Sequence, residues 1–344
     1  MIVTLSSSGL MALYGVYCRS YRWVEVGEVT QLYLYPLKSG QALSVPEVEC
    51  GLLAPGLGDL QDRGFMVVTS QGRGVDLRSG HDRLVLIQLE HLGQASWRLS
   101  APGVEPCTFT APQDSGEEEV EEVTFSHLDT TVSGADCGEA PASWVSNFLG
   151  AELRIIQHKR SDQSTRKARP KYTRTYPRTF LTNCVPSYAD VTPYMVTSDK
   201  SLLDLNSRLP EHIAREVTQV TFRPNMVVGG SDLAAWEEDR WVGEVRLGGA
   251  VLTYSKDCTR CTATKINPVT GELYPENQPL AALKEFRQHE GGHRIIRRAV
   301  GDSPIFGMHY TLLTPGYNTR APGWGESFKA QYLQERFVSE TPSG

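Results

Sequence analysis

The chain has 344 residues, of which 40% are hydrophobic and 22% are charged, and its formal net charge is −6. This length allows two ordinary domains or one large domain with a sizeable core. The composition is typical of a soluble globular protein, and the acidic balance argues against a chain that binds nucleic acid through its overall charge. The 7 cysteines are odd in number and scattered. This usage does not fit a secreted disulfide framework and favours a reducing, cytosol-facing environment.

Residues 1–28 form a predicted leader. No charged side chain occurs from Ile2 to Cys18, and Arg19 and Arg22 follow. The run is shorter than the roughly 20 apolar residues of a spanning helix. It also lacks the basic start and the cleavage site of a secretory signal. Two interpretations stay open on the residues alone: a disordered or partly buried leader, or a short signal-anchor that leaves the main domain in the cytosol.

Residues 29–158 predict a β-rich first domain, because short apolar runs alternate with turn signals. The run SWRLSAPGVEPCTFTAP predicts two strands joined by a Gly/Pro turn, and RLVLIQLEHLG is interpreted as part of the same β-rich pattern. The acidic stretch at 117–122 is interpreted as a solvated insertion and not as an acidic docking site. APASWVSNFLGA, at 140–151, predicts a short amphipathic helix.

The segment 159–178 is the predicted domain boundary, because it contains eight Lys or Arg residues, one acid and two prolines. A second domain is predicted over 159–320, followed by an uncertain tail at 321–344. SDKSLLDLNSRL predicts a helix with Ser198 or Asp199 as its N-cap. β-rich runs and one further short helix follow. The expected fold class is therefore mostly β with some helices (α+β), with barrels favoured over a doubly wound sheet.

Cys258 and Cys261 lie three residues apart, with Arg260 beside the second. The spacing leaves three alternatives: half of a zinc site, a redox dithiol, or one reactive thiolate with a neighbour that takes no part. No second CxxC completes a four-cysteine zinc site. An adjacent arginine predicts a lowered pKa for the thiol. Basic and hydroxyl residues in YPLKSG, LQDRGF and FRPN suit a phosphate, so the residues predict a phosphorylated cofactor beside a sulfur.

Taken in order, these stretches resemble the MOSC proteins, and specifically the family of mitochondrial amidoxime-reducing components. The resemblance runs from about residue 30 to residue 313 and includes DCGEAPASWVSNFLG, SLLDLNSRL, FRPN, CTRCTATKINPVTGELYPENQPLAALKEFR and SPIFG. It implies an N-terminal MOSC-associated β-rich domain, a MOSC β-barrel domain, and a bound molybdenum cofactor (Mo-molybdopterin).

The resemblance also implies roles for individual residues. Cys261 is expected to be the catalytic residue and the metal ligand, and Cys258 a neighbour that is not a ligand. The expected cofactor-binding residues are Lys38, Ser39, Arg63, Thr192, Arg223, Asn225, Thr259, Arg260 and His309. The sequence departs from the family in two places. Relatives carry an aromatic residue where His309 stands, a role that Tyr310 takes only through a register shift. The tail also lacks the usual closing strand of the barrel.

The resemblance implies a molybdenum-dependent reductase of N-hydroxylated compounds such as amidoximes. Electrons are expected from NADH through cytochrome b5 reductase and cytochrome b5, at the mitochondrial outer membrane facing the cytosol. The basic segment 159–178 is either a docking face for the acidic cytochrome or a solvated linker. Two other functions stay open: a carrier module that delivers cofactor or sulfur, and a docking protein with a degenerate site. The chain has no room for the pyridoxal-phosphate desulfurase domain of the longer cofactor sulfurases.

Overall fold

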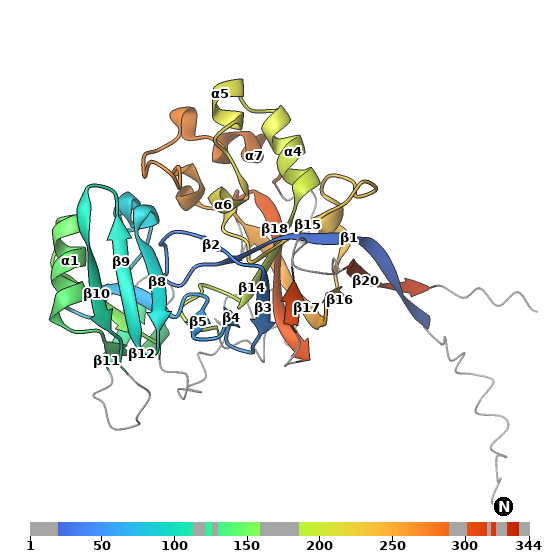
Figure 1. Ribbon diagram of the computed structural model, residues 1–344. Coiled ribbons are helices and arrows are strands. Elements are labelled where there is room, and N and C mark those ends of the chain that lie inside the picture. The colour runs from blue at the N-terminus through green and yellow to red at the C-terminus, as the bar shows by residue number, and fades with distance from the viewer. Residues whose placement is uncertain are drawn as a thin grey trace, which may run out of the picture.

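The computed structural model describes residues 20–112, 121–125, 130–158, 186–288, 301–314, 318–320 and 329–336 (Figure 1). These residues form a mostly β architecture with a few short helices, as the sequence predicts.

The largest sheet closes on itself as a barrel. Its strands follow the order β15–β14–β18–β17–β16–β20–β1, and β1 pairs in turn with β15. β14 and β15 run parallel, and the other neighbours run antiparallel. Closure leaves the ring without an unpaired strand edge. The barrel strands are β1 (Ser20–Leu34), β14 (Tyr194–Ser198), β15 (Met226–Gly229), β16 (Glu244–Leu247), β17 (Ala250–Thr259), β18 (Ile305–Thr314) and β20 (Lys329–Arg336), and β2 (Leu43–Ser44) pairs with the end of β1.

β1 and β20 come from the two ends of the chain and lie side by side, with Ser20 opposite Arg336. Residues 20–28 of the predicted leader are therefore part of a barrel strand, and the tail beyond residue 320 contributes its neighbour. The predicted division of the chain into domains stays a prediction, and its boundary segment 159–178 lies outside the described residues. Within the described part of the chain, no helix is long and apolar enough to cross a membrane. The expected anchor at residues 2–18 lies outside that part.

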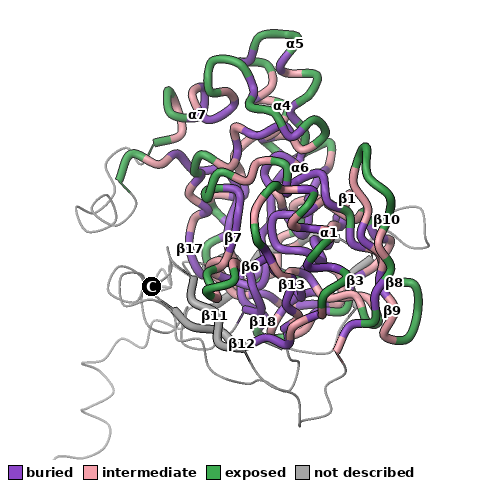
Figure 2. The backbone as a smooth tube through the Cα atoms, turned by 90° about the vertical axis from the view of Figure 1, so that its left-hand side faces the viewer, coloured by how far each residue is buried: buried purple, intermediate pink, exposed green. Residues whose placement is uncertain are grey.

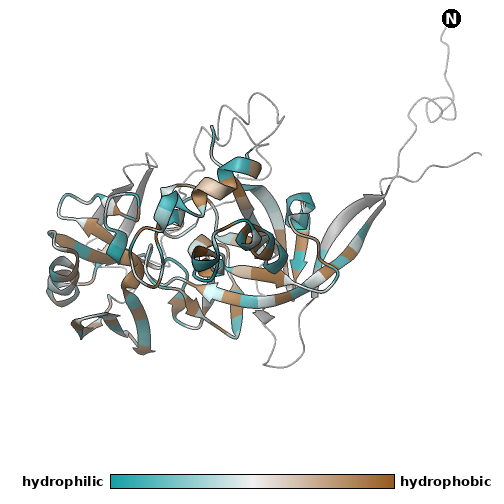
Figure 3. Ribbon diagram, turned by 90° about the horizontal axis from the view of Figure 1, so that it is seen from above, coloured by the Kyte–Doolittle hydropathy of each residue, from teal (hydrophilic) through white to brown (hydrophobic). Residues whose placement is uncertain are grey.

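The barrel interior is packed with apolar side chains that alternate along its strands. Val29, Leu32 and Leu34 of β1 are buried in the same cluster as Trp241 and Tyr310. Figure 3 shows this alternation along β1, the long strand that leads toward the N-terminus. Each large apolar side chain buried in this way contributes roughly 1.5–3 kcal/mol to stability. The barrel is thus a filled core, and a ligand has to bind at one of its ends.

The first half of the chain forms two further sheets around a second core. Phe65 and Trp97 meet edge to face in this core, with ring centres 4.7 Å apart. The order β11–β12–β13–β6–β7 describes one sheet and β10–β9–β8 the other. Their bounds are β6 (Phe65–Thr69), β7 (Gly74–Val75), β8 (Gln88–Gly93), β9 (Ser96–Ala101), β10 (Val104–Thr110), β11 (Glu121–Phe125), β12 (Thr130–Asp136) and β13 (Leu153–Gln157), and helix α1 (Glu139–Leu149) packs against β10 and β13.

Local patterns predicted most of these elements, with two corrections. The β9–β10 hairpin and helix α1 are confirmed. The apolar run after residue 82, by contrast, forms a 3-10 helix, η1 (Asp82–Leu86), before β8 begins. The acidic stretch at 117–122 ends inside a strand, because Glu121 and Glu122 pair in β11, and the residues before them lie outside the described part of the chain. A short apolar run cannot by itself distinguish a helical turn from a strand.

A small sheet and a layer of helices complete the fold. The sheet has the order β19–β3–β4–β5, with β3 (Glu47–Cys50), β4 (Pro55–Leu57), β5 (Leu60–Gln61) and β19 (Asn318–Arg320). Figure 1 shows the helices gathered at one end of the barrel, and Figure 2 shows that their outer turns are exposed. They are α4 (Asp199–Ser207), α5 (Glu211–Ala214), α6 (Gln219–Phe222), α7 (Leu280–Phe286), η2 (Glu237–Arg240), η3 (Thr262–Lys265) and η4 (Pro275–Asn277).

The helical layer holds the segments that carry two of the predicted site residues, Arg223 and Cys261. Ser198 caps α4 as predicted, because its hydroxyl accepts hydrogen bonds from the Lys200 and Ser201 amides. α6 ends at Arg223, and η3 begins directly after Cys261. A core of its own, which includes Phe222 and Phe306, fixes this layer on the barrel.

Candidate functional site

A pocket of about 380 Å³ is enclosed by residues from the first half of the chain, the barrel and the helical layer. The structure brings together in its lining all ten residues expected from the sequence: Lys38, Ser39, Arg63, Thr192, Arg223, Asn225, Thr259, Arg260, Cys261 and His309. These positions span most of the chain, so the convergence is a property of the fold and not of any local segment.

Lys38 lies at one end of the pocket and is buried. Its ammonium group donates to the Tyr188 carbonyl, 2.9 Å away, and forms an ion pair with Asp190. Burial lowers the pKa of the Lys38 ammonium, and the negative charge of Asp190 opposes that effect. The adjacent Ser39 hydroxyl has no hydrogen-bond partner among the described residues.

Three of the expected phosphate-binding residues have left-handed backbone conformations. The φ angles are 69° at Ser39, 49° at Arg63 and 57° at Arg223. A non-glycine residue in this region costs roughly 1–2 kcal/mol, so it persists where the surrounding structure determines it. The Arg63 amide is held by the Tyr35 carbonyl at 2.7 Å, and the Arg223 amide caps α6 through the Val220 carbonyl at 3.1 Å. Such conformations concentrate at functional sites.

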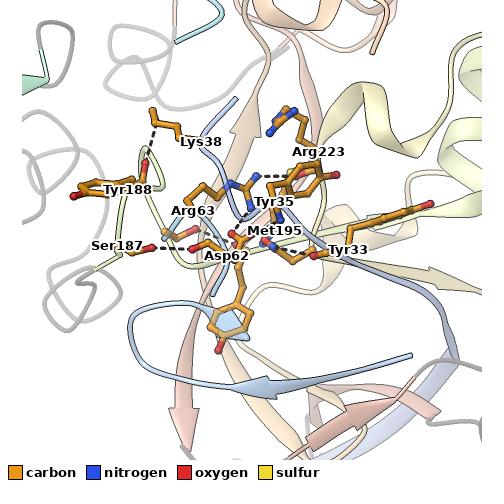
Figure 4. Close-up of polar contacts among 12 residues, drawn as sticks. Tyr33, Tyr35, Lys38, Asp62, Arg63, Ser187, Tyr188, Met195 and Arg223 are labelled. Atoms are coloured by element: carbon orange, nitrogen blue, oxygen red, sulfur yellow. Dashed lines mark hydrogen bonds and ion pairs between the residues drawn. The ribbon is translucent and has the colours of Figure 1, made fainter. Parts of the chain in front are cut away.

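Arg63 and Arg223 come from distant parts of the chain and meet at this end of the pocket (Figure 4). Arg63 is paired with the buried Asp62 carboxylate, and its Nη2 donates to the Arg223 carbonyl at 3.2 Å. Arg223 Nη1 donates to the Gly40 carbonyl at 2.8 Å. Its Nη2 is buried and has no hydrogen-bond partner among the described residues. Burial lowers the pKa of the Arg223 guanidinium to about 10, so the group stays charged at neutral pH.

Cys261 also lines the pocket, with its side chain exposed, whereas Cys258 is buried. The walls of the pocket still remove much of the water around the Cys261 sulfur. This desolvation raises the pKa of the Cys261 thiol, although the Ala263 amide, Arg78 and Arg260 oppose the effect. The expectation of a lowered pKa is therefore wrong, because desolvation of the thiol outweighs the effect of the neighbouring positive charges.

The Arg260 guanidinium points into the protein framework. Its Nε donates to the Phe306 carbonyl and its Nη1 to the Phe222 carbonyl, both at 2.8 Å. The Arg260 amide is also occupied, because it donates to the Pro304 carbonyl at 2.7 Å. Arg260 thus ties β18 and the end of α6 to the segment between β17 and η3 that carries Cys261, and it lines the pocket.

His309 lines the pocket, and Tyr310 does not. Tyr310 is fully buried in the barrel core, where its hydroxyl donates to the Trp241 carbonyl at 3.1 Å. No register shift brings it to the site, because β18 pairs His309 with Lys256 on β17. His309 Nδ1 lies 2.8 Å from the Thr192 hydroxyl. Burial, together with the cations of Lys256 and Arg260, holds the pKa of His309 well below its ordinary value, so the imidazole is neutral at pH 7.

Comparison with known proteins gives matches over most of the chain. The MOSC N-terminal beta barrel domain matches residues 26–152, and the MOSC domain matches residues 185–320. Mitochondrial amidoxime-reducing component 1 of Mus musculus is 35% identical over 302 residues, which cover 87% of this chain and 82% of the relative. Its namesake from Homo sapiens is 33% identical, with 85% and 80% covered. Mitochondrial amidoxime reducing component 2 of Homo sapiens is 32% identical, with 86% and 82% covered. This chain belongs to the family of amidoxime-reducing components.

The pocket lining of this amidoxime-reducing-component family member also contains Asp76, Arg78 and Asp190, charged residues that the sequence did not predict. Arg78 Nη2 forms ion pairs with Asp76 at 2.7 Å and with Asp190 at 2.8 Å. The turn DLRSG between β7 and η1 has the same character as the turn that carries Lys38, so this arginine had a detectable signal. Asp190 stands two residues before Thr192 and joins Arg78 to Lys38.

Lys256 is a further charged lining residue that the sequence did not predict. It is 1% exposed and sits inside strand β17, where alternation shows only which face a residue occupies. Asn225 was expected to contact a cofactor, and the structure shows it tying strands together. Its side-chain Oδ1 accepts from the Met195 amide at 3.2 Å, and its carbonyl accepts from the Tyr33 amide at 2.8 Å.

Proposed function

We propose that this protein is a molybdenum-cofactor-dependent oxidoreductase that reduces N-hydroxylated compounds such as amidoximes. The names of its relatives support the substrate class. The pocket supports the cofactor, because its lining combines one exposed thiol with several buried or partly buried cations. This combination suits a ligand that carries both a metal able to bind thiolate and a phosphate.

The observation that carries the proposal is the buried Nη2 of Arg223, for which no described residue provides an acceptor. A charged donor left in this state is unfavourable unless a ligand completes it. A cofactor phosphate fits that position, with Lys38, Ser39 and Arg63 around it. Cys261 would hold the metal through its sulfur, and Thr192, Asn225, Thr259 and His309 would line the space between. When bound, the molybdenum supplies two-electron chemistry at the N–O bond of the substrate.

The chain's own residues have defined tasks in this reaction. Because burial raises the pKa of the Cys261 thiol, binding of a metal has to release its proton. Arg260 keeps the segment with Cys261 in place through the Phe306 and Phe222 carbonyls. Reduction of N–OH to N–H consumes two electrons and two protons and releases water. His309 is neutral, and its contact with Thr192 orients the ring at the pocket wall.

A direct test combines metal analysis of the purified protein with a benzamidoxime reduction assay driven by NADH, cytochrome b5 reductase and cytochrome b5. We expect about one molybdenum per chain and reduction that depends on all three components. Protein with full molybdenum content that fails to reduce benzamidoxime would argue for a carrier of the cofactor. A persulfide on Cys261 in the mass spectrum would identify a carrier of sulfur.

The proposed electron donor makes a separate prediction for the basic segment 159–178, which lies outside the described residues. Electrostatic steering weakens with salt, since the screening length falls from roughly 10 Å at 0.1 M to about 3 Å at 1 M. Reversal of Arg166, Lys167 and Arg169 to Glu should slow turnover with cytochrome b5 and flatten its salt dependence. Turnover with a small chemical reductant should be spared. Unchanged kinetics with the cytochrome at low salt would make the segment a linker.

The proposed location is the mitochondrial outer membrane, facing the cytosol, with residues 2–18 as a signal-anchor. Deletion of these residues should release active enzyme into the soluble fraction of the cell, because the site residues begin at Lys38. A full-length protein that is already soluble after fractionation would contradict the anchor.

A further inference from the structure

Tyr35 is fully buried at the end of β1 and contacts both arginines of the phosphate end through one ring. The guanidinium carbon of Arg63 lies 4.4 Å from the ring centre, and that of Arg223 lies 4.3 Å from it. Figure 4 shows the ring against both side chains. Tyr35 is not itself part of the pocket lining.

The main chain of Tyr35 holds the same group of residues. Its amide donates to Asp62 Oδ1 at 2.8 Å, and its carbonyl accepts from the Arg63 amide at 2.7 Å. The second of these bonds fixes Arg63 in its left-handed conformation, and Asp62 in turn pairs with the Arg63 guanidinium. One residue therefore contacts both the backbone and the charge of Arg63, and the charge of Arg223.

Arg63 and Arg223 are both positively charged, so they repel each other where both contact the Tyr35 ring. The positive charge of Arg63 is one of the causes that lower the pKa of Arg223, after burial. The electron-rich face of an aromatic ring attracts a guanidinium, and more strongly where water is excluded. The ring of Tyr35 thus offsets part of the repulsion and restricts both side chains before any ligand arrives.

The hydroxyl of Tyr35 has no part in this arrangement. It is buried and has no hydrogen-bond partner among the described residues. A buried hydroxyl without a partner destabilises a protein. The side chain of Tyr35 therefore contributes to the site through its ring alone, and phenylalanine can supply that ring.

We propose that Tyr35 is the positioning residue of a two-arginine clamp for a phosphate group, with Arg63 and Arg223 as its arms. The inference rests on the phosphate end of the proposed function. It goes further by naming the residue that pre-organises the clamp and by predicting that the aromatic ring is required and the hydroxyl is not.

The test uses the full-length chain, produced in cells that cannot make molybdopterin, with inorganic phosphate as the probe. The dissociation constant is obtained from the rise of the melting temperature with phosphate concentration. Tyr35→Leu should weaken phosphate binding roughly tenfold, because two cation–π contacts are lost. Tyr35→Phe should bind phosphate like the native chain and melt at the same or a higher temperature.

Tyr310→Leu is the matched control, because it removes an equally buried tyrosine from the barrel core, away from the pocket. Its melting temperature should fall while its phosphate affinity stays native. Equal affinity in Tyr35→Leu and the native chain would overturn the inference, as would loss of affinity in Tyr35→Phe or in the control. A native chain that shows no response to phosphate would overturn it too. Reduction of benzamidoxime by the cofactor-loaded enzyme is scored separately and reports on the proposed function.

Discussion

Two arginines of the pocket lining differ in how their guanidinium groups are held. Arg223 keeps one buried nitrogen, Nη2, without an acceptor among the described residues, and it lies on a left-handed backbone. Arg260 lies next to the thiol in sequence, yet its Nε and Nη1 donate to main-chain carbonyls. The first arginine is prepared for a ligand and the second supports the framework. Presence in the pocket wall therefore does not by itself identify a ligand-binding charge.

The largest expected effect is the difference in N-reduction activity between a variant of Cys261 and a variant of Cys258. Cys261→Ala should lower N-reduction by at least about 100-fold, because the change removes the proposed metal ligand. Cys258→Ser should keep most of the activity, since Cys258 is buried in the helical layer's core. Initial rates with benzamidoxime, normalised to folded protein, provide the measurement. Equal losses in the two variants would indicate a dithiol or zinc site.

Replacement of Arg260 should act mainly by lowering the stability of the fold. Arg260→Ala leaves the Phe306 and Phe222 carbonyls without their donor, and we expect a loss of roughly 2–5 kcal/mol in the free energy of unfolding. Denaturant titration followed by intrinsic fluorescence gives this value. Arg223→Ala is the matched variant and should lose less stability than Arg260→Ala. Similar losses in the two would erase the proposed contrast between them.

Removal of the cations at the phosphate end should weaken cofactor retention. Arg223→Ala and Lys38→Ala each remove a charge-assisted contact worth roughly 1.5–3 kcal/mol, which is about a 10- to 100-fold loss of affinity. Molybdenum content should therefore fall on dilution of the purified variants. Content that equals the native value in both variants would place the phosphate elsewhere.

Glu238 offers a contrast to Arg223, because it is a buried ionisable group that does not line the pocket. Glu238 is fully buried, accepts a hydrogen bond from the Ser201 hydroxyl at 2.7 Å, and has one oxygen with no partner among the described residues. Burial raises its pKa to about 7, from 4.5 for an ordinary glutamate. The folded state then holds a proton that the unfolded state releases, so stability should fall as the pH rises from about 4.5 to about 7.

Replacement of this carboxylate should remove that pH dependence. Glu238→Gln should match the native protein near pH 5 and exceed it by about 1–3 kcal/mol at pH 8, because the amide has no charge to bury. Denaturation midpoints measured across this range supply the comparison. A native protein whose stability does not change between pH 5 and pH 8 would contradict it. In contrast to Arg223, no ligand is expected to compensate this group.

The sequence by itself determined the local elements. The β9–β10 hairpin, helix α1 and the Ser198 cap follow from short-range patterns, since turn residues, alternation and capping hydroxyls act over a few positions. The ordered motifs also identified ten residues that the fold brings to one pocket. Arg78 also lies in a turn like that of Lys38, so the local sequence indicates it as a further candidate.

Only the tertiary structure decided what those residues do there. Pairing of β1 with β20 joins the two ends of the chain, and such long-range pairing leaves no local trace. The register of β17 against β18 places His309 at the pocket and Tyr310 in the core. The Arg260 side chain turns toward carbonyls that lie far away in sequence. The folded pocket removes water from the Cys261 thiol and so raises its pKa, although Arg260 opposes the effect. Burial and side-chain direction depend on all the spatial neighbours of a residue at once, and the residues adjacent to it in sequence specify neither.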